Sequence, residues 1–153
     1  MSIPVTPTLS VVVPCFNEEP ALPETFRRLR AVCEGLQVPY ELVFVDDGSR
    51  DATWHLIAAQ AAATGDVRGI KLSRNFGHEK ALAAGLAEAR GERILILDAD
   101  LQDPPELLPR MMELMDEGYH SVCGRRRSRD GESWLKKMTS WVFYWFINLL
   151  SEF

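Results

Sequence analysis

Residues 94–102 read Ile-Leu-Ile-Leu-Asp-Ala-Asp-Leu-Gln, an apolar run that ends in acidic side chains at alternate positions. Such a run is typical of a strand that is buried on both faces of a parallel sheet. Because residues two apart on an extended segment point the same way, Asp98, Asp100 and Gln102 can face one point beyond the strand. Oxygen donors there suit a Mg²⁺ or Mn²⁺ that also holds a diphosphate. Since an Asp-x-Asp pattern also arises by chance, the rest of the sequence must support this hypothesis.

Strand and helix patterns alternate along the chain, with short connections between them. This alternation predicts an α/β fold with a mainly parallel sheet that is covered by helices on both faces. The helix after the third strand is rich in alanine, which favours close packing on the sheet. The predicted strands span residues 9–14, 40–46, 67–73, 93–98 and 120–124, and the predicted helices span 21–33, 51–64, 78–89 and 104–117.

Polar and charged residues follow all five predicted strands. In open parallel sheets, ligands bind outside the carboxyl ends of the strands. Turn formation alone would not need so many acids and arginines at these positions, so we predict a binding site at this edge of the sheet. The five segments are 14–19, 46–49, 73–77, 98–100 and 124–125.

The composition is that of an ordinary soluble globular chain with room for one domain, at 153 residues, 46% hydrophobic and 25% charged. The net charge of −5 is unevenly placed: residues 1–124 carry 11 Lys and Arg against 19 Asp and Glu, and residues 125–153 carry 6 against 3. A basic tail on an acidic body favours a local anionic partner and argues against nucleic-acid binding. The three cysteines form no C-x-x-C pair, which predicts reduced thiols in the cytosol.

The end of the chain is both aromatic and basic. Three of the four tryptophans fall in residues 134–153, next to the arginines of residues 125–129. Residues 1–8 lack a signal-peptide pattern, and no segment has the roughly 20 apolar residues that a membrane span needs. These features predict an amphipathic helix that lies in the membrane interface near anionic head groups. A helix that caps the sheet, or that joins copies of the chain in a homo-oligomer, is the alternative.

Five ordered motifs between residue 9 and about residue 152 resemble those of family 2 glycosyltransferases. The match is closest to the polyprenyl-phosphate branch, which includes dolichol-phosphate mannose synthases and bactoprenol glucosyltransferases. The motifs are V-V-V-P-C-F-N-E-E at 11–19, F-V-D-D-G-S-R-D at 44–51, L-S-R-N-F-G at 72–77, L-D-A-D-L-Q-D-P-P-E-L at 97–107 and G-R-R-R-S-R-x-G-E-S-W at 124–134.

The resemblance implies a Rossmann-like GT-A fold and an inverting, metal-dependent transfer of a sugar from a nucleotide sugar to a polyprenyl phosphate. Residues 1–133 would form the nucleotide-sugar-binding domain. Residues 134–153 would form a truncated interfacial helix, peripheral to the cytoplasmic face of the cell membrane. UDP-glucose is the favoured donor, because residues 72–77 resemble bactoprenol enzymes.

The resemblance also assigns roles to individual residues. It implies that Asp98, Asp100 and Gln102 bind the Mg²⁺ or Mn²⁺ and the diphosphate. The proposed catalytic residues are Asp100 and Arg125. Arg125 is also assigned to the acceptor phosphate, together with Lys136 and Ser140, which lie four apart and can share a helix face. The nucleotide-sugar pocket is assigned to Pro14, Phe16, Glu18, Val45, Asp47, Asp98, Ala99, Asp100 and Gln102.

Three neighbouring residues have structural interpretations. For Asp46, a role in fixing the turn at Gly48 competes with a role in the pocket. Asp103 has the pattern of a helix N-cap, with a catalytic base as the alternative. We interpret His78 as a surface or capping residue.

Two other functions stay open. One is a soluble family 2 transferase that acts on a saccharide hydroxyl, and the other is a truncated, non-catalytic nucleotide-binding module. Relatives in the family continue past the last residue of this chain. We therefore expect the chain to bind a nucleotide sugar with metal but to turn over poorly alone.

Overall fold

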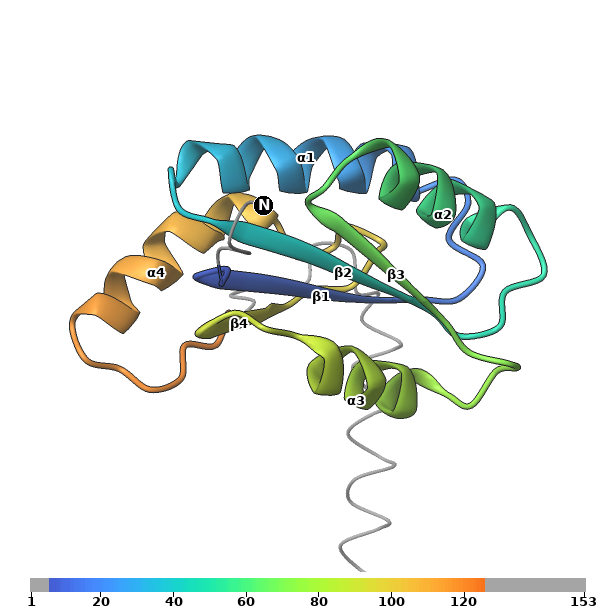
Figure 1. Cartoon of the computed structure of the whole chain (residues 1–153). Coiled ribbons are helices and arrows are strands. Elements are labelled where there is room, and N and C mark those ends of the chain that lie inside the picture. Colours follow the sequence, from blue (N-terminus) through green and yellow to red (C-terminus); the bar gives the residue numbers. More distant parts are fainter. Residues whose placement is uncertain (1–5, 126–153) are drawn as a thin grey trace, which may run out of the picture. The chain divides into compact units, whose positions relative to one another are not determined.

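The protein, seen in a computed structural model, is described for residues 6–125. It divides into two compact units, Met1–Tyr119 and His120–Phe153, and the fold belongs to the first unit. Strands and helices alternate along that unit (Figure 1). The elements are β1 (Leu9–Cys15), α1 (Leu22–Gly35), β2 (Tyr40–Asp46), α2 (Thr53–Ala63), β3 (Val67–Lys71), α3 (His78–Glu88), β4 (Arg93–Ile96), the 3₁₀ helix η1 (Pro105–Leu107) and α4 (Leu108–Asp116).

The four strands form one fully parallel sheet in the order β3-β2-β1-β4. Helices α1 and α2 cover one face, and α3 lies on the other (Figure 1). The sequence prediction of an α/β fold with a parallel sheet between two helical layers is therefore confirmed. All carboxyl ends of the strands lie at one edge of this sheet, as the parallel pairing requires.

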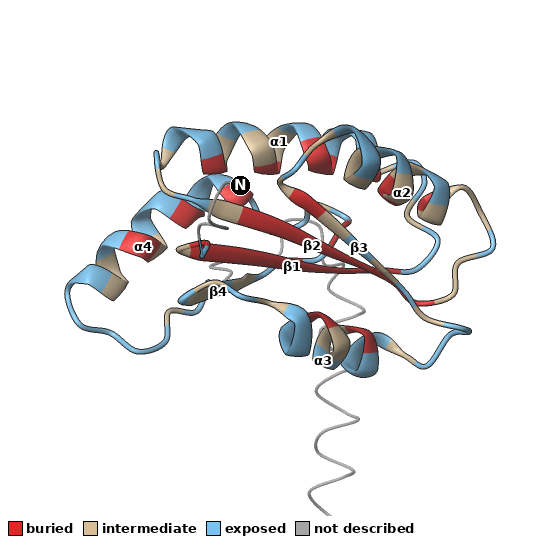
Figure 2. Ribbon diagram, viewed as in Figure 1, coloured by how far each residue is buried: buried red, intermediate tan, exposed pale blue. Residues whose placement is uncertain are grey.

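The two central strands β1 and β2 are almost completely buried (Figure 2). Val11 and Val13 of β1 belong to the core beneath α1 and α2, and Val12 belongs to the core beneath α3. Helix α3 packs so closely that a Cβ atom on Gly85 would collide with Val12. This confirms the expectation that small residues let α3 approach the sheet.

The fourth strand and the helix after it differ in detail from the prediction. β4 ends at Ile96, so the two acids of the Asp-x-Asp pattern lie in the loop beyond it. The helix expected at 104–117 begins as a 3₁₀ turn, and Pro104 instead of Asp103 takes the N-cap position. Two prolines in succession explain this tight start, because neither offers an N–H for an α-helical hydrogen bond.

The prediction of a fifth strand at residues 120–124 is wrong. These residues carry no strand, and within the described residues 6–125 the sheet ends at β3 and β4. A strand forms only with a hydrogen-bonding neighbour, and local sequence does not supply one. The predicted interfacial helix and the domain boundary between residues 133 and 134 lie outside the described residues.

Candidate active site

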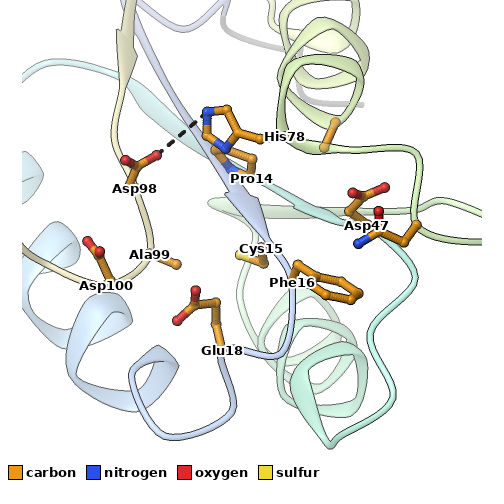
Figure 3. A pocket seen from close by; sticks show the side chains of 11 residues that line it. Pro14, Cys15, Phe16, Glu18, Asp47, His78, Asp98, Ala99 and Asp100 are labelled. Atoms are coloured by element: carbon orange, nitrogen blue, oxygen red, sulfur yellow. Dashed lines mark ion pairs between the residues drawn. The ribbon is translucent and has the colours of Figure 1, made fainter. Parts of the chain in front are cut away.

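A pocket of about 300 Å³ opens at the carboxyl ends of β1 and β2, beside the loop that follows β4 (Figure 3). It combines four acidic side chains with one aromatic ring and one histidine. Its walls come from four different strand ends and from the start of α3. The lining residues are Pro14, Cys15, Phe16, Glu18, Asp47, Asn75, His78, Ala81, Asp98, Ala99 and Asp100.

The structure brings most of the residues assigned to the nucleotide sugar into this one pocket. Val45 instead is fully buried in the core beneath α3, and the pocket lining does not include Gln102. Arg125 belongs to the second unit, and Lys136 and Ser140 lie outside the described residues. The seven that line it are Pro14, Phe16, Glu18, Asp47, Asp98, Ala99 and Asp100.

One side of the pocket is strongly acidic. The side chains of Glu18, Asp98 and Asp100 lie on the same side of the pocket (Figure 3). Partial burial and then the charge of Asp100 raise the pKa of the Glu18 carboxyl above its ordinary value. A pocket in which neighbouring carboxylates disfavour the charge of Glu18 is a site that a cation would stabilise.

This acidic side fits a divalent cation of the Mg²⁺ or Mn²⁺ type. Its donors are hard carboxylate oxygens, and the side chain of Asp98 is half exposed to the pocket. Across the described residues 6–125, no group of three or more His, Cys, Asp or Glu side chains is arranged to hold a metal by itself. Such a site suits a cation that takes one or two carboxylates and fills its other positions with water and phosphate oxygens.

Asp47 fixes the loop between β3 and α3 against the pocket. Its two carboxylate oxygens accept hydrogen bonds from the backbone N–H groups of Phe76 and Gly77, at 2.8 and 2.9 Å. Gly48 permits this contact, because its φ is +69° and a Cβ atom there would collide with the backbone of Arg74. Asp47 therefore shapes the pocket as well as lining it.

Asp46 has the structural role that the sequence offered for it. Its Oδ1 accepts a hydrogen bond from the N–H of Ser49 at 3.1 Å and so closes the turn at Gly48. The residue is fully buried, and the pocket lining does not include it.

Thr25 of α1 holds the acidic loop in place, a contact that the sequence analysis missed. Its fully buried hydroxyl lies 2.8 Å from the carbonyl oxygen of Ala99, between the two acids, and 2.9 Å from the carbonyl oxygen of Ala21. Arg28, one turn further along α1, forms an ion pair with Glu106. Helix α1 therefore supports the loop that carries Asp98 and Asp100.

Replacing Thr25 by valine is expected to weaken metal-dependent nucleotide binding by about tenfold, because partners that orient ligand residues typically contribute this much. Thr25→Val keeps the shape but leaves the Ala99 carbonyl without its donor, whereas Thr25→Ser keeps the hydroxyl and should bind within about twofold of the parent chain. Calorimetry with UDP or GDP, with and without Mn²⁺, measures the effect. A loss of thermal stability with unchanged nucleotide affinity would limit Thr25 to a structural role.

His78 and Asn75 line the pocket although the sequence analysis gave them no part in it. Both follow the end of β3, so the rule that located the other strand-end residues could have selected them. Cys15 and Ala81 are the other unpredicted lining residues, and burial raises the pKa of the Cys15 thiol well above its ordinary value. Cys15 is therefore a protonated packing residue.

Solved structures of glycosyltransferases resemble this fold. The mannosyltransferase PcManGT from Pyrobaculum calidifontis, in complex with GDP-Man and Mn²⁺, aligns with a TM-score of 0.64 and 26% identity over 80% of this chain and 37% of that chain. TarS 1–349 of S. aureus, in complex with UDP-GlcNAc, aligns with a TM-score of 0.60 and 28% identity over 80% of this chain and 37% of that chain. The fold is therefore of the predicted GT-A class.

The sequence model of glycosyl transferase family 2 matches residues 10–152, and the chain belongs to that family. An uncharacterized glycosyltransferase of Synechocystis is 42% identical over 97% of this chain and 46% of its own length. The undecaprenyl-phosphate 4-deoxy-4-formamido-L-arabinose transferase of Aeromonas hydrophila is 43% identical over 86% of this chain and 40% of its own length. The chain thus spans less than half the length of these relatives.

Proposed function

We propose that this chain is the donor-binding part of an inverting, metal-dependent glycosyltransferase that moves a sugar from a nucleotide sugar to a polyprenyl phosphate. The observation that carries the proposal is the acidic pocket, in which Asp98 and Asp100 lie beside Glu18 at the carboxyl ends of the strands. Membership of family 2 supports sugar transfer. The name of the Aeromonas relative supports a polyprenyl phosphate as the acceptor.

The donor would occupy the pocket between Phe16 and the acidic loop. The ring of Phe16 is 42% exposed and offers a face on which a base can stack. Asp47 can accept a further hydrogen bond from the base or the ribose, because each carboxylate oxygen has two lone pairs. UDP-glucose is the proposed donor, on the resemblance of residues 72–77 to bactoprenol glucosyltransferases.

Asp98, Asp100 and, after movement of its loop, Gln102 are the proposed ligands of Mg²⁺ or Mn²⁺. When bound, such a cation supplies positive charge that offsets the charge developing on the leaving diphosphate. The support for this assignment is the crowding of carboxylates in the pocket, where burial and then the charge of Asp100 raise the pKa of Glu18. PcManGT, whose structure contains GDP-Man and Mn²⁺, is a precedent among the similar folds.

The proposed reaction is a single displacement at the anomeric carbon of the sugar. An oxygen of the acceptor phosphate forms a bond to that carbon, and the bond from the carbon to the diphosphate oxygen breaks. The electron pair leaves with the nucleoside diphosphate, and attack from the opposite side inverts the configuration. A phosphate monoester has a second pKa of about 6, so no side chain has to remove a proton from it at neutral pH.

The acceptor phosphate is proposed to bind Arg125, Lys136 and Ser140, with residues 134–153 at the cytoplasmic face of the membrane. Positioning of the acceptor oxygen next to the anomeric carbon would then provide much of the catalysis. None of the described helices is long and apolar enough to cross a bilayer.

A donor panel with product detection tests this function. The chain is mixed with UDP-glucose, GDP-mannose or UDP-N-acetylglucosamine, with Mn²⁺ or Mg²⁺, and with undecaprenyl phosphate in detergent. Mass spectrometry should find one sugar linked to the lipid phosphate, formed slowly because the chain spans less than half of its relatives.

The other outcomes separate the alternatives. Transfer to a saccharide hydroxyl, with none to the lipid phosphate, would identify a soluble family 2 transferase. Calorimetric binding of a nucleoside diphosphate without any product from the whole donor panel would identify a non-catalytic nucleotide-binding module.

A further inference from the structure

His78 is the one basic side chain among the described residues that line the pocket. It is the first residue of α3, and its ring points across the pocket toward Asp98 (Figure 3). The Nε2 atom lies 3.8 Å from Oδ1 of Asp98, which is longer than a hydrogen bond. Its side chain is 58% exposed, and the ring makes no hydrogen bond with the described residues. A ring N–H therefore faces the pocket with no other hydrogen-bond partner.

The position of His78 relative to the acids limits what its ring can bind. The other charged groups that line the pocket are the carboxylates of Glu18, Asp47, Asp98 and Asp100, which repel an anion. A cation held beside Asp98 and Asp100 would draw a diphosphate to that side of the pocket. A diphosphate held on that cation would lie within reach of the ring of His78, whose N–H is a donor in both protonation states.

We propose that His78 is a phosphate-contacting residue of the donor subsite and donates a hydrogen bond from its ring to a diphosphate oxygen. The proposal rests on the proposed function only in taking the donor to be a nucleoside diphosphate sugar. The backbone N–H groups of Phe76 and Gly77, just before His78, are already bonded to Asp47. Those two N–H groups are therefore not available to the ligand, whereas the ring of His78 faces the pocket.

Two substitutions at this position test the proposal by binding alone. His78→Ala should weaken the binding of UDP or GDP, with Mn²⁺ present, by about tenfold or more, since a hydrogen bond to a charged group contributes about 1.5–3 kcal/mol. His78→Gln keeps an N–H donor and should recover part of the affinity. Binding of uridine or guanosine, which carry no phosphate, should be unchanged in both variants when followed by NMR titration.

His55→Ala is the matched control, because His55 is exposed on α2 and does not line the pocket. It should bind both ligands like the parent chain. Unchanged affinity of His78→Ala for the nucleoside diphosphate overturns the inference, and so does an equal loss for the nucleoside and its diphosphate. If the parent chain itself binds neither UDP nor GDP with metal, the proposed function fails instead, so the two failures are distinguishable.

Discussion

Replacing Asp100 by asparagine is expected to lower the rate of sugar transfer by about 10²- to 10³-fold. The substitution removes one negative charge from the acidic loop and keeps its shape. Oδ1 of Asp100 accepts a hydrogen bond from the N–H of Gln102 at 3.0 Å, and the asparagine oxygen can accept the same bond. A bound divalent cation contributes several kcal/mol to the stabilisation of a leaving group, and each tenfold in rate corresponds to about 1.4 kcal/mol.

Nucleotide binding gives a second and sharper readout of the Asp100→Asn substitution. With Mn²⁺ present, the variant should bind a nucleoside diphosphate more weakly than the parent chain, because one cation ligand is weakened. With a chelator present, it should bind the diphosphate as well or better, because one repelling carboxylate has been neutralised. Calorimetry under both conditions tests this reversal. An equal loss with and without metal would show damage to the pocket and contradict the metal assignment.

Glu92→Gln provides the control for charge removal in the same part of the chain. Glu92 is exposed in the connection between α3 and β4, at the amino end of β4 and so at the sheet edge opposite the pocket. Its substitution changes the net charge by the same amount as Asp100→Asn. Transfer and nucleotide binding should both stay close to those of the parent chain, with and without metal.

The parallel sheet could be predicted because the strands are encoded locally. The apolar runs of β1 and β2 are buried on both faces, and such runs are distinctive in sequence. Residues 120–124 were also predicted as a strand but form none, since pairing depends on a neighbour that local sequence does not specify. The ends of β3 and β4 were predicted two residues too far along the chain, because the ladders stop at Lys71 and Ile96 and only one further backbone hydrogen bond, from Leu72 or Leu97, follows each.

The acids of the candidate site could be predicted because they directly follow buried strands. Val45 was assigned to the pocket as well, because the family resemblance places it with Asp47. It lies two residues before Asp47 and so on the same face of the strand. One step further inside the sheet, that face is covered by α3, and Val45 packs against Ala81 in the core. The role of Thr25 depends on a contact 74 residues away along the chain, which no local pattern encodes.

A buried network at the amino ends of the strands, away from the pocket, holds β1, β2 and the start of β4 together. Glu41 of β2 is only 3% exposed. Its carboxylate accepts hydrogen bonds from the hydroxyl of Ser10 at 2.7 Å, from the backbone N–H of Arg90 at 2.7 Å and from the Arg90 guanidinium at 2.6 and 3.0 Å. The Ser10 hydroxyl in turn accepts the N–H of Gly91 at 2.8 Å. One carboxylate on β2 therefore satisfies donors from two other segments of the chain.

Replacing Glu41 by alanine should lower the free energy of unfolding by about 2–4 kcal/mol, because it leaves the buried Ser10 hydroxyl and the Arg90 backbone N–H without their acceptor. Urea unfolding at neutral pH measures this loss. Glu24→Ala is the control, because its ion pair with Arg27 on α1 is exposed and should add little to the free energy of unfolding. A loss at Glu41 no larger than this would contradict the structural role of the network.

Acid should remove the same contribution from the parent chain. Burial alone would raise the pKa of Glu41, but the hydrogen bonds from Arg90 and Ser10 outweigh it and lower the pKa below its ordinary value of 4.5. A carboxyl whose folded pKa is lowered stabilises the fold fully above its unfolded pKa, and this contribution is lost as the pH falls through the folded value. Below pH 4.5, the free energy of unfolding should therefore decrease more steeply with falling pH for the parent chain than for Glu41→Gln. Parallel curves would mean that Glu41 titrates alike in the folded and unfolded chains.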